Sequence, residues 1–282
     1  MGALLRAAAR AVYGAYAWAA LLAIVIPLCV VFALTPGLRR RRRAARAGAR
    51  LFFIALGSPL KVHGPGLPDS TCVVVANHAS YLDGIVLTAA LPPSFTFLIK
   101  QEMAAVPIAG FVLSRLGSRF VDRKDATHRH RTVRSLVASA VGGEALALFP
   151  EGMIDPRPGL KAFQLGGFAA ASKAGLPVVP AVIFGSRAML PSNRLLPAPG
   201  AIEVRICEPL APADFDSPRS LMRACRERIL AHLGEPDLEA AAQLEAEPLP
   251  GDEPEPEREP GPEPDLTSPD NSARHPPRAA ST

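Results

Sequence analysis

The sequence predicts an α/β fold in which a mostly parallel sheet is flanked by helices, with an N-terminal membrane-embedded helical segment and a disordered C-terminal tail. Three observations predict it. Short apolar runs alternate with helical patterns along the middle of the chain, an order typical of parallel strands joined by helices. A twenty-residue stretch near the N-terminus carries no charge, and the last forty-eight residues are acidic and rich in proline.

The central elements follow from hydrophobic periodicity. Apolar runs of strand length lie at 71–76, 95–99, 145–149, 178–184 and 202–206. Helical patterns lie between or after them at 84–90, 108–116, 127–140, 163–174 and 217–233. This alternation predicts a sandwich of helices around a largely parallel sheet.

The N-terminal segment is expected to embed in a membrane. Residues 15–34 are uncharged and long enough for a helix to cross a bilayer, with a kink expected at Pro27. The apolar part is too long for a cleaved signal peptide, and no small-residue cleavage site stands out. A second apolar patch at 51–56 leaves another arrangement open, a helix pair over 11–58 that lies within one leaflet.

Arginines indicate the orientation of this segment. Those at 39–43, 46 and 50 outnumber Arg6 and Arg10 on the other side, so the positive-inside rule places the rest of the chain on the cytoplasmic side of the cell (inner) membrane. The run adjoins a membrane segment and has no interleaved aromatic residues, so we expect no nucleic acid as partner.

Composition divides the chain into the anchor with its basic stretch (1–58), a folded domain (59–234) and a tail (235–282). The tail has thirteen acidic residues, three arginines and eleven prolines, too polar a composition to bury a core. Its net charge of −10 leaves +15 on residues 1–234, since the whole chain carries +5. A basic body suits anionic lipid surfaces.

The candidate active site begins directly after the run at 71–76. Residues 77–83 read Asn-His-Ala-Ser-Tyr-Leu-Asp, which puts His78 and Asp83 beyond the end of a buried strand, where α/β folds bind their ligands. Histidine accepts a proton near neutral pH, and a carboxylate on its other ring nitrogen fixes the tautomer. The pair alone is more typical of a strand end at which Ser80 or Asp83 caps a helix starting near Gly84, with His78 as an ordinary loop residue.

Three further blocks follow: Gly-Ser-Arg-Phe-Val-Asp-Arg at 117–123, Phe-Pro-Glu-Gly at 149–152 and Val-Pro-Ala at 179–181. Together with the first block, their order and spacing resemble the glycerolipid acyltransferases of the lysophosphatidate acyltransferase type, over about residues 62–210. Lys100 and Lys161 lie in weaker matches. The resemblance implies that the four blocks form one active site, with His78 and Asp83 as the catalytic dyad.

The resemblance also implies a set of substrate-binding residues: Gly117, Phe120, Arg123, Pro150, Glu151, Gly152 and Pro180. The Arg123 guanidinium suits a phosphate, although a surface salt bridge with a neighbouring aspartate is its other interpretation. Glu151, in a tight turn that ends a strand, can accept a hydrogen bond from an acceptor hydroxyl or hold a nearby arginine. Pro180 is expected either in the apolar wall of an acyl channel or at a strand end.

The third block departs from the family pattern. Met153 and Ile154 stand where the family usually has a threonine and often an arginine, and only Arg157 lies near enough in sequence to replace the lost cation. This departure bears on the identity of the acceptor more than on the type of reaction.

The mechanism expected is direct transfer. The chain has no Gly-x-Ser-x-Gly motif, and nothing marks Cys72 as an activated thiolate, so no residue is indicated as the carrier of an acyl-enzyme. His78 would deprotonate the 2-hydroxyl of lysophosphatidate as it attacks acyl-CoA or acyl carrier protein, giving phosphatidate in phospholipid synthesis. The expected partners are therefore an acyl thioester, a lysophospholipid and the bilayer.

Two alternatives remain open. The first is an acyltransferase for another lysolipid, for example a lyso-ornithine lipid, and the second is a catalytically silent lipid-binding membrane protein. We expect no cofactor and no metal, because His128 and His130 are two residues apart and no acidic or cysteine ligands cluster with them. The four scattered cysteines suggest reduced thiols.

Overall fold

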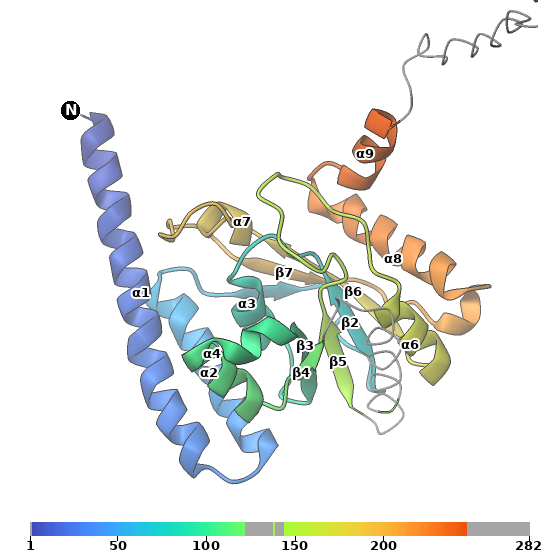
Figure 1. Cartoon of the computed structure of the whole chain (residues 1–282), viewed down its shortest axis with the longest axis horizontal. Helices are drawn as coiled ribbons and strands as arrows, with labels where there is room; N and C mark the ends of the chain where they lie inside the picture. Colours follow the sequence, from blue (N-terminus) through green and yellow to red (C-terminus); the bar gives the residue numbers. More distant parts are fainter. Residues whose placement is uncertain (1, 122–137, 139–143, 247–282) are drawn as a thin grey trace, which may run out of the picture. The chain divides into compact units, whose positions relative to one another are not determined.

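A seven-stranded sheet forms the centre of the protein, in a computed structural model that describes residues 2–121, 138 and 144–246. Within this part of the chain the strand order is β1-β7-β6-β2-β5-β3-β4 (Figure 1). The strands are β1 (Lys61–His63), β2 (Val73–Ala76), β3 (Phe95–Lys100), β4 (Arg119–Val121), β5 (Ala145–Leu148), β6 (Val178–Phe184) and β7 (Glu203–Ile206). Strands β6, β2, β5, β3 and β4 are parallel, whereas β7 pairs antiparallel with β6 and parallel with β1. The predicted mostly parallel α/β sheet is confirmed.

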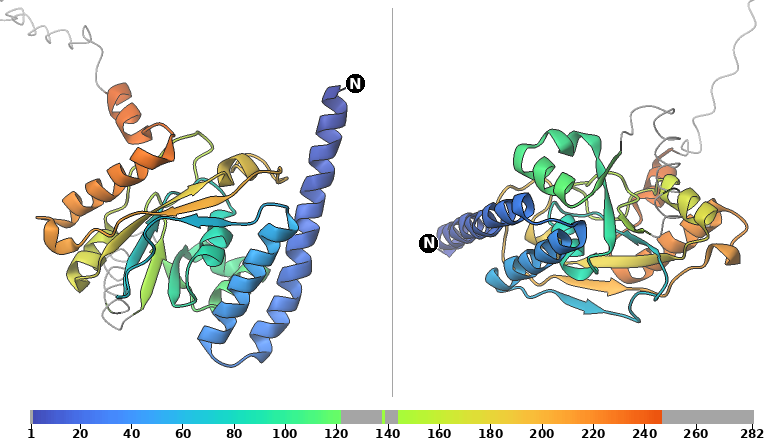
Figure 2. Two further views of the ribbon diagram at one scale, coloured as in Figure 1. Left: turned by 180° about the vertical axis from the view of Figure 1, so that it is seen from behind. Right: turned by 90° about the horizontal axis from the view of Figure 1, so that it is seen from below.

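Helices cover both faces of the sheet, as the alternation of side chains along each strand requires (Figures 1 and 2). Side chains such as Val74 and Val179 pack with helices α2 (Leu38–Ala55) and α3 (Asp83–Ala90) on one face. Their strand neighbours Val73 and Val178 pack with α6 (Gly166–Ala174) and α8 (Pro218–Leu233) on the other face. The buried apolar runs thus fill two cores, one on each side of the sheet.

The N-terminal segment is a pair of helices. Helix α1 (Gly2–Leu34) runs on through Pro27 and is followed by α2 after a short turn in which Gly37 has a φ of 85° (Figure 1). Of the described helices, only α1 is long and apolar enough to cross a membrane. Three aromatic side chains fix it to its neighbours: Tyr13 and Tyr16 donate to the carbonyls of Leu56 and Ala55, and the Trp18 indole donates to that of Leu195.

The arginines of α2 serve a structural purpose that the sequence did not reveal. Arg46 and Arg50 donate to carbonyls in the last turn of α3, and Arg41 and Arg42 donate to those at the end of α4 (Pro107–Arg115). Cations are favourable at helix C-termini, where carbonyl groups lack helical partners. At least part of the basic run therefore stabilises the fold itself.

The shorter elements escaped prediction because they are too brief to show a period. They are the 3₁₀ turns η1 (Gln101–Ala105) and η2 (Pro212–Asp214), helix α7 (Ser186–Met189) and strands β1 and β4. The helix expected at 127–140 lies mainly outside the described residues.

The start of the tail differs from the expectation. Residues 1–242 form one compact unit, and helix α9 (Leu238–Ala246) lies where disorder was predicted from Glu235 onward. The acidic, proline-rich average over forty-eight residues concealed a short run of good helix formers, Leu-Glu-Ala-Ala-Ala-Gln-Leu-Glu-Ala. Asp237 caps this helix by accepting hydrogen bonds from the backbone N–H groups of Glu239 and Ala240.

Candidate active site

One edge of the sheet gathers most of the predicted site. Because β2, β5, β3 and β4 are parallel, their carboxyl ends at Ala76, Leu148, Lys100 and Val121 lie along the same edge. The blocks that begin at residues 77 and 149 leave the sheet there, at the place where open α/β sheets bind ligands. Arg123 follows β4 closely in sequence but lies outside the described residues.

His78 and Asp83 face each other at this edge. The His78 Nδ1 atom lies 3.1 Å from Asp83 Oδ2, and the imidazole stacks on the Phe149 ring at a centroid distance of 4.1 Å. The Asp83 side chain is fully buried, whereas 20% of the His78 side chain is exposed. With Nδ1 directed at the carboxylate, Nε2 is the nitrogen left for proton transfer.

Asp83 also organises the backbone around His78. It is the first residue of α3, and its Oδ2 accepts hydrogen bonds from the N–H groups of Ala79 and Ser80 at 2.7 and 2.8 Å. A carboxylate is favoured at a helix N-terminus. No described side chain caps α3, so the capping interpretation of this motif is wrong, and Asp83 instead joins the imidazole to the backbone of the preceding loop.

Two polar side chains hold this loop in place: Asn77, for which no role was predicted, and Ser80, which was expected as a helix cap. The Asn77 side-chain oxygen accepts from the Ile183 N–H at 2.7 Å, and its amide nitrogen donates to the Ile183 carbonyl at 3.1 Å. The Ser80 hydroxyl donates to the Leu190 carbonyl at 2.7 Å. Asn77 thus joins the loop after β2 to strand β6. Polar residues directly after a buried strand were the available signal.

Glu151 lies beneath His78 and is 5% exposed. Its Oε1 accepts the backbone N–H of His78 at 2.6 Å, and its Oε2 accepts that of Lys161 at 3.1 Å. Burial raises the pKa of this carboxyl to about 7, an effect that the two N–H groups oppose. Both oxygens are thus engaged by backbone amides, a contact different from the acceptor hydroxyl or arginine expected from the sequence.

The remaining predicted residues are more dispersed. Gly117 has a φ of 69° in the turn between α4 and β4, and a Cβ there would lie 3.1 Å from the Leu38 side chain. Phe120 is half-buried in β4, and Gly152 has a φ of 82° in the turn after Pro150. Their positions fit structural roles in turns and packing; the substrate-binding role of these residues stays a prediction.

Pro180 does not end a strand, because β6 continues to Phe184. It lies opposite Val75 of β2, and its carbonyl accepts from the Cys207 N–H. Between the pairs Val178–Leu210 and Ala181–Ile206 the second segment has one extra residue, so Pro180 sits at a bulge where no ladder N–H is needed.

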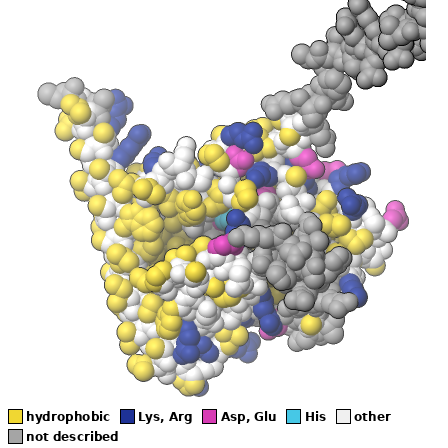
Figure 3. Space-filling model, viewed as in Figure 1, with side chains coloured by type: hydrophobic (Ala, Val, Ile, Leu, Met, Phe, Trp, Pro, Cys, Tyr) yellow, Lys and Arg dark blue, Asp and Glu magenta, His cyan; other side chains and the backbone are white. Residues whose placement is uncertain are grey.

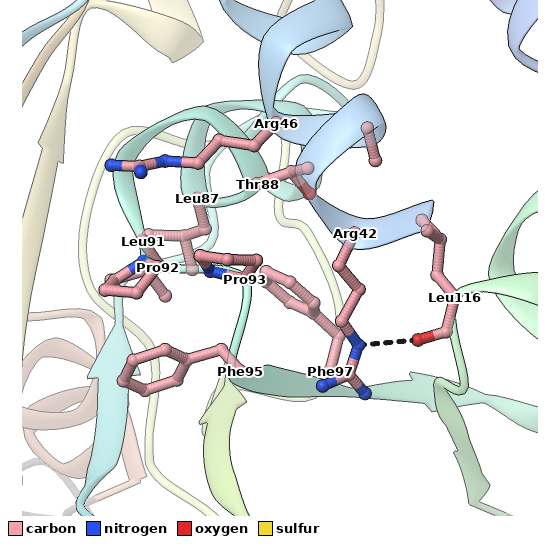
Figure 4. A pocket seen from close by; sticks show the side chains of 11 residues that line it. Arg42, Arg46, Leu87, Thr88, Leu91, Pro92, Pro93, Phe95, Phe97 and Leu116 are labelled. Atoms are coloured by element: carbon pink, nitrogen blue, oxygen red, sulfur yellow. Dashed lines mark hydrogen bonds between the residues drawn. The ribbon is translucent and has the colours of Figure 1, made fainter. Parts of the chain in front are cut away.

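A separate pocket lies between α2, the end of α3 and the start of β3 (Figure 4). Its lining combines apolar side chains such as Leu87 and Phe95 with Arg42 and Arg46. The Arg42 guanidinium is occupied, because it donates to the Leu116 and Ser94 carbonyls and to the Thr96 hydroxyl. The pocket adjoins the first residue of β3, at the opposite edge of the sheet from His78.

Exposed apolar side chains gather along α1 and the elements beside it (Figure 3). On α1, Trp18, Leu22, Ile26 and Val30 recur every fourth residue and are 40–57% exposed. This spacing places them along one stripe of the helix. A contiguous apolar surface of this kind is typical of a membrane contact.

Comparisons with known proteins agree with this architecture. Residues 59–184 match the family model described as Acyltransferase. The 1-acyl-sn-glycerol-3-phosphate acyltransferase of Haemophilus influenzae is 27% identical over 176 residues, which cover 61% of this chain and 72% of that protein. The chloroplastic enzyme BAT2 of Brassica napus, with the same activity in its name, is 31% identical over 125 residues, or 44% of this chain. The chain spans about a third (36%) of the length of the Brassica protein.

The crystal structure of the 1-acyl-sn-glycerophosphate (LPA) acyltransferase PlsC from Thermotoga maritima has the same fold. Its TM-score is 0.69 at 23% identity, with 86% of this chain and 99% of that one covered. The fold and the edge that carries His78 and Asp83 define the class, an α/β acyltransferase domain. Residues 59–184 are matched as an acyltransferase domain, and this part of the chain is similar in sequence to 1-acyl-sn-glycerol-3-phosphate acyltransferases.

Proposed function

We propose that the protein transfers an acyl chain from acyl-CoA or acyl carrier protein to the sn-2 hydroxyl of lysophosphatidate, giving phosphatidate. The observation that carries this proposal is the His78–Asp83 pair, 3.1 Å apart at the carboxyl edge of the sheet with the imidazole partly exposed. The activity in the names of its relatives supplies the substrate class.

The proposed chemistry needs one base and no covalent enzyme intermediate. His78 Nε2 removes the proton of the acceptor hydroxyl as that oxygen attacks the thioester carbon, and Asp83 stabilises the imidazolium that forms. When the carbon–sulfur bond breaks, the thiolate takes up the proton from His78. Such base catalysis contributes about 10²- to 10⁴-fold, and positioning of the two substrates supplies much of the rest.

The cysteines support direct transfer. Cys72 is 2% exposed, and burial raises the pKa of its thiol to about 11. Burial also raises the pKa of Cys207 and Cys225. Thiols of this kind are not nucleophiles at neutral pH, so an acyl-cysteine intermediate has no carrier among these three residues.

Phosphate recognition is proposed for cations at the same edge. Arg123 is the residue implied by the family motif, and the parallel strand β4 leads the chain to this edge two residues before it. Lys161 belongs to the loop after β5, and its side chain is 25% exposed. Met153 and Ile154 leave that loop without the usual arginine, and this motivates the second candidate, acylation of a different lysolipid such as a lyso-ornithine lipid.

For the cellular setting we propose that residues 1–58 anchor a catalytic domain at the cytoplasmic side of the inner membrane. The contacts of α1 favour insertion within one leaflet over a full span. The body contacts α1 along much of its length, from Tyr13 to Ala33. A helix that crossed the bilayer would carry these polar partners into hydrocarbon at an unfavourable free energy.

A panel of lysolipids tests the proposed function. The purified enzyme would be given lysophosphatidate, other lysophospholipids or a lyso-ornithine lipid, each with acyl-CoA and with acyl carrier protein as donor. We expect phosphatidate from lysophosphatidate with at least one donor. If the enzyme acylates another lysolipid but not lysophosphatidate, lysophosphatidate is not its acceptor. If no combination of donor and lysolipid releases thiol, a silent lipid-binding protein is favoured.

A further inference from the structure

The loop between β5 and α6, residues 149–165, carries Glu151 and Lys161 and is fixed from outside by two arginines. The Arg187 Nη1 donates to the carbonyls of Asp155 and Arg157, each at 2.9 Å, and its Nη2 donates to that of Gly159 at 3.3 Å. One half-buried side chain thus holds three backbone carbonyls, at alternate residues of the loop. No part of the proposed chemistry uses Arg187.

The segment that follows α8 completes this arrangement. Glu235 accepts from Arg187 Nε and Nη2, both at 3.0 Å, and from the Gly159 N–H at 2.8 Å. Leu160 then pairs with the same segment, because its N–H donates to the Pro236 carbonyl and its carbonyl accepts from the Leu238 N–H. Leu160 and Asp237 therefore form an isolated parallel β-bridge between the loop and this segment.

The second arginine, Arg226, holds the loop at Leu160 and Lys161. Arg226 of α8 is 9% exposed, and it donates to the carbonyls of Leu160 and Lys161 and to both carboxylate oxygens of Asp237. Its guanidinium also lies 3.0 Å from the Glu239 carboxylate. Such bidentate pairs are geometrically demanding as well as favourable. Asp237 and Glu239 thus supply the direct carboxylate partners of this buried arginine.

These contacts converge on the backbone of Lys161. Its N–H is held by Glu151, which also holds His78, and its carbonyl is held by Arg226. The position of the Lys161 backbone relative to His78 is therefore set by a continuous chain of hydrogen bonds, and its ammonium lies 3.9 Å from the Asp155 carboxylate of the same loop. A cation at this position is suited to the phosphate of an acceptor whose hydroxyl lies at His78.

We propose that Arg187, Arg226, Glu235 and Asp237 form a clamp that fixes the β5–α6 loop and thereby sets the affinity for the phosphorylated acceptor. They are positioning residues: they contact the loop, and the loop contacts the substrate. The identity of the acceptor in this inference rests on the proposed function. The immobilised loop rests on the structure alone.

Replacement of Glu235 tests the clamp, because this side chain is partly exposed and far from the core. Glu235→Ala removes the carboxylate that accepts from Arg187 and from the Gly159 N–H, whereas Glu235→Gln keeps an acceptor for Gly159. We expect the KM for lysophosphatidate to rise about tenfold in Glu235→Ala and less in Glu235→Gln, with the KM for acyl-CoA unchanged. Glu227→Ala, at an exposed position of α8, is the matched control and should leave both constants unchanged.

Backbone amide exchange gives a second measurement that does not depend on turnover. Residues 155–161 should exchange faster in Glu235→Ala than in the wild type or in Glu227→Ala, with an unchanged melting temperature. If exchange and the acceptor KM are both unchanged, or if both substrates' KM values change equally, the clamp is wrong. A wild-type enzyme that ignores lysophosphatidate would refute the proposed acceptor, while the exchange result would still decide whether the clamp exists.

Discussion

At the residue scale, the two carboxylates of the site differ in what they bind. Asp83 contacts the imidazole and two N–H groups of its own loop, whereas Glu151 accepts N–H groups from two separate loops, at His78 and Lys161. Burial dominates at Glu151 and raises its pKa from 4.5 to about 7. The folded protein therefore retains a proton on this group that the unfolded chain has already lost.

This difference makes stability depend on pH. Between about pH 4.5 and 7 the folded state binds more protons at Glu151 than the unfolded state, so the free energy of unfolding falls as the pH rises. At about 1.4 kcal/mol per pKa unit, the shift corresponds to about 3 kcal/mol across this range. In Glu151→Gln this part of the pH dependence should be absent.

Denaturant unfolding of both proteins between pH 5 and 8 measures the effect. The exposed Glu227 supplies the control, since Glu227→Gln should follow the wild-type curve. Parallel pH curves for wild type and Glu151→Gln would show that Glu151 is ionised throughout and that its two N–H partners outweigh its burial.

The sequence predicted local geometry at the site better than distant geometry. His78 and Asp83 are five residues apart across the end of a strand and the start of a helix, so their approach follows from local structure. The contact from Glu151 to His78 joins residues 73 apart and uses a backbone amide, which no side-chain pattern encodes. The contacts of residues 235–238 with Leu160 could not be predicted for the same reason. In addition, the average composition of residues 235–282 hid the ordered start of that segment.

At the element scale, α2 has two functions in one helix. Its apolar residues, among them Phe52 and Phe53, fill the core beside α3, while its arginines reach the C-terminal carbonyls of α3 and α4. The charge pattern predicted only a membrane flank. Position within the run distinguishes the arginines, because Arg42 is half-buried and Arg43, its neighbour, is exposed.

The neighbouring arginines provide a matched pair of variants. Arg42→Met removes hydrogen bonds to Leu116, Ser94 and Thr96 and should lower the free energy of unfolding by about 2–4 kcal/mol, since hydrogen bonds from charged groups are worth about 1.5–3 kcal/mol each and are not additive. Arg43→Met should leave unfolding unchanged and weaken binding to anionic vesicles. Equal effects of both variants on stability would argue against a structural role specific to Arg42.

The strands and long helices were predictable because their periods are long enough to read. Strand β6 was predicted at its observed bounds, and α3, α4 and α8 each began within one residue of expectation. Strands β1 and β4 have three residues each and depend on pairing with β7 and β3 rather than on their own sequence. Tertiary contacts alone define such elements.

At the scale of the whole molecule, the proposed membrane anchor α1 bears on how the catalytic edge would meet the lipid. Its apolar stripe is exposed, while Tyr13, Trp18 and the carbonyls of Phe32 and Ala33 are bonded to the body. The helix is about 50 Å long at 1.5 Å per residue, so a full span would separate contacts that the structure holds together. The proposed insertion within one leaflet would keep both substrates at the same interface.

The side of the membrane on which the N-terminus lies tests this arrangement. An epitope tag before Gly2 and the same tag at Asp69, an exposed residue between β1 and β2, should both be digested when protease reaches only the catalytic face of sealed vesicles. Digestion of the tag at Asp69 together with protection of the N-terminal tag would establish a full span and refute insertion within one leaflet.

The most direct test of the central claim is thiol release from acyl-CoA with lysophosphatidate by His78→Ala, compared with the wild type and with His63→Ala, an exposed histidine of β1. The base role of His78 predicts a fall in kcat of about 10²- to 10⁴-fold in His78→Ala alone, with unchanged melting temperature and vesicle binding. If kcat of His78→Ala falls by less than about threefold, the loss is far smaller than the expected range. That result would contradict the claim that this imidazole removes the acceptor's proton.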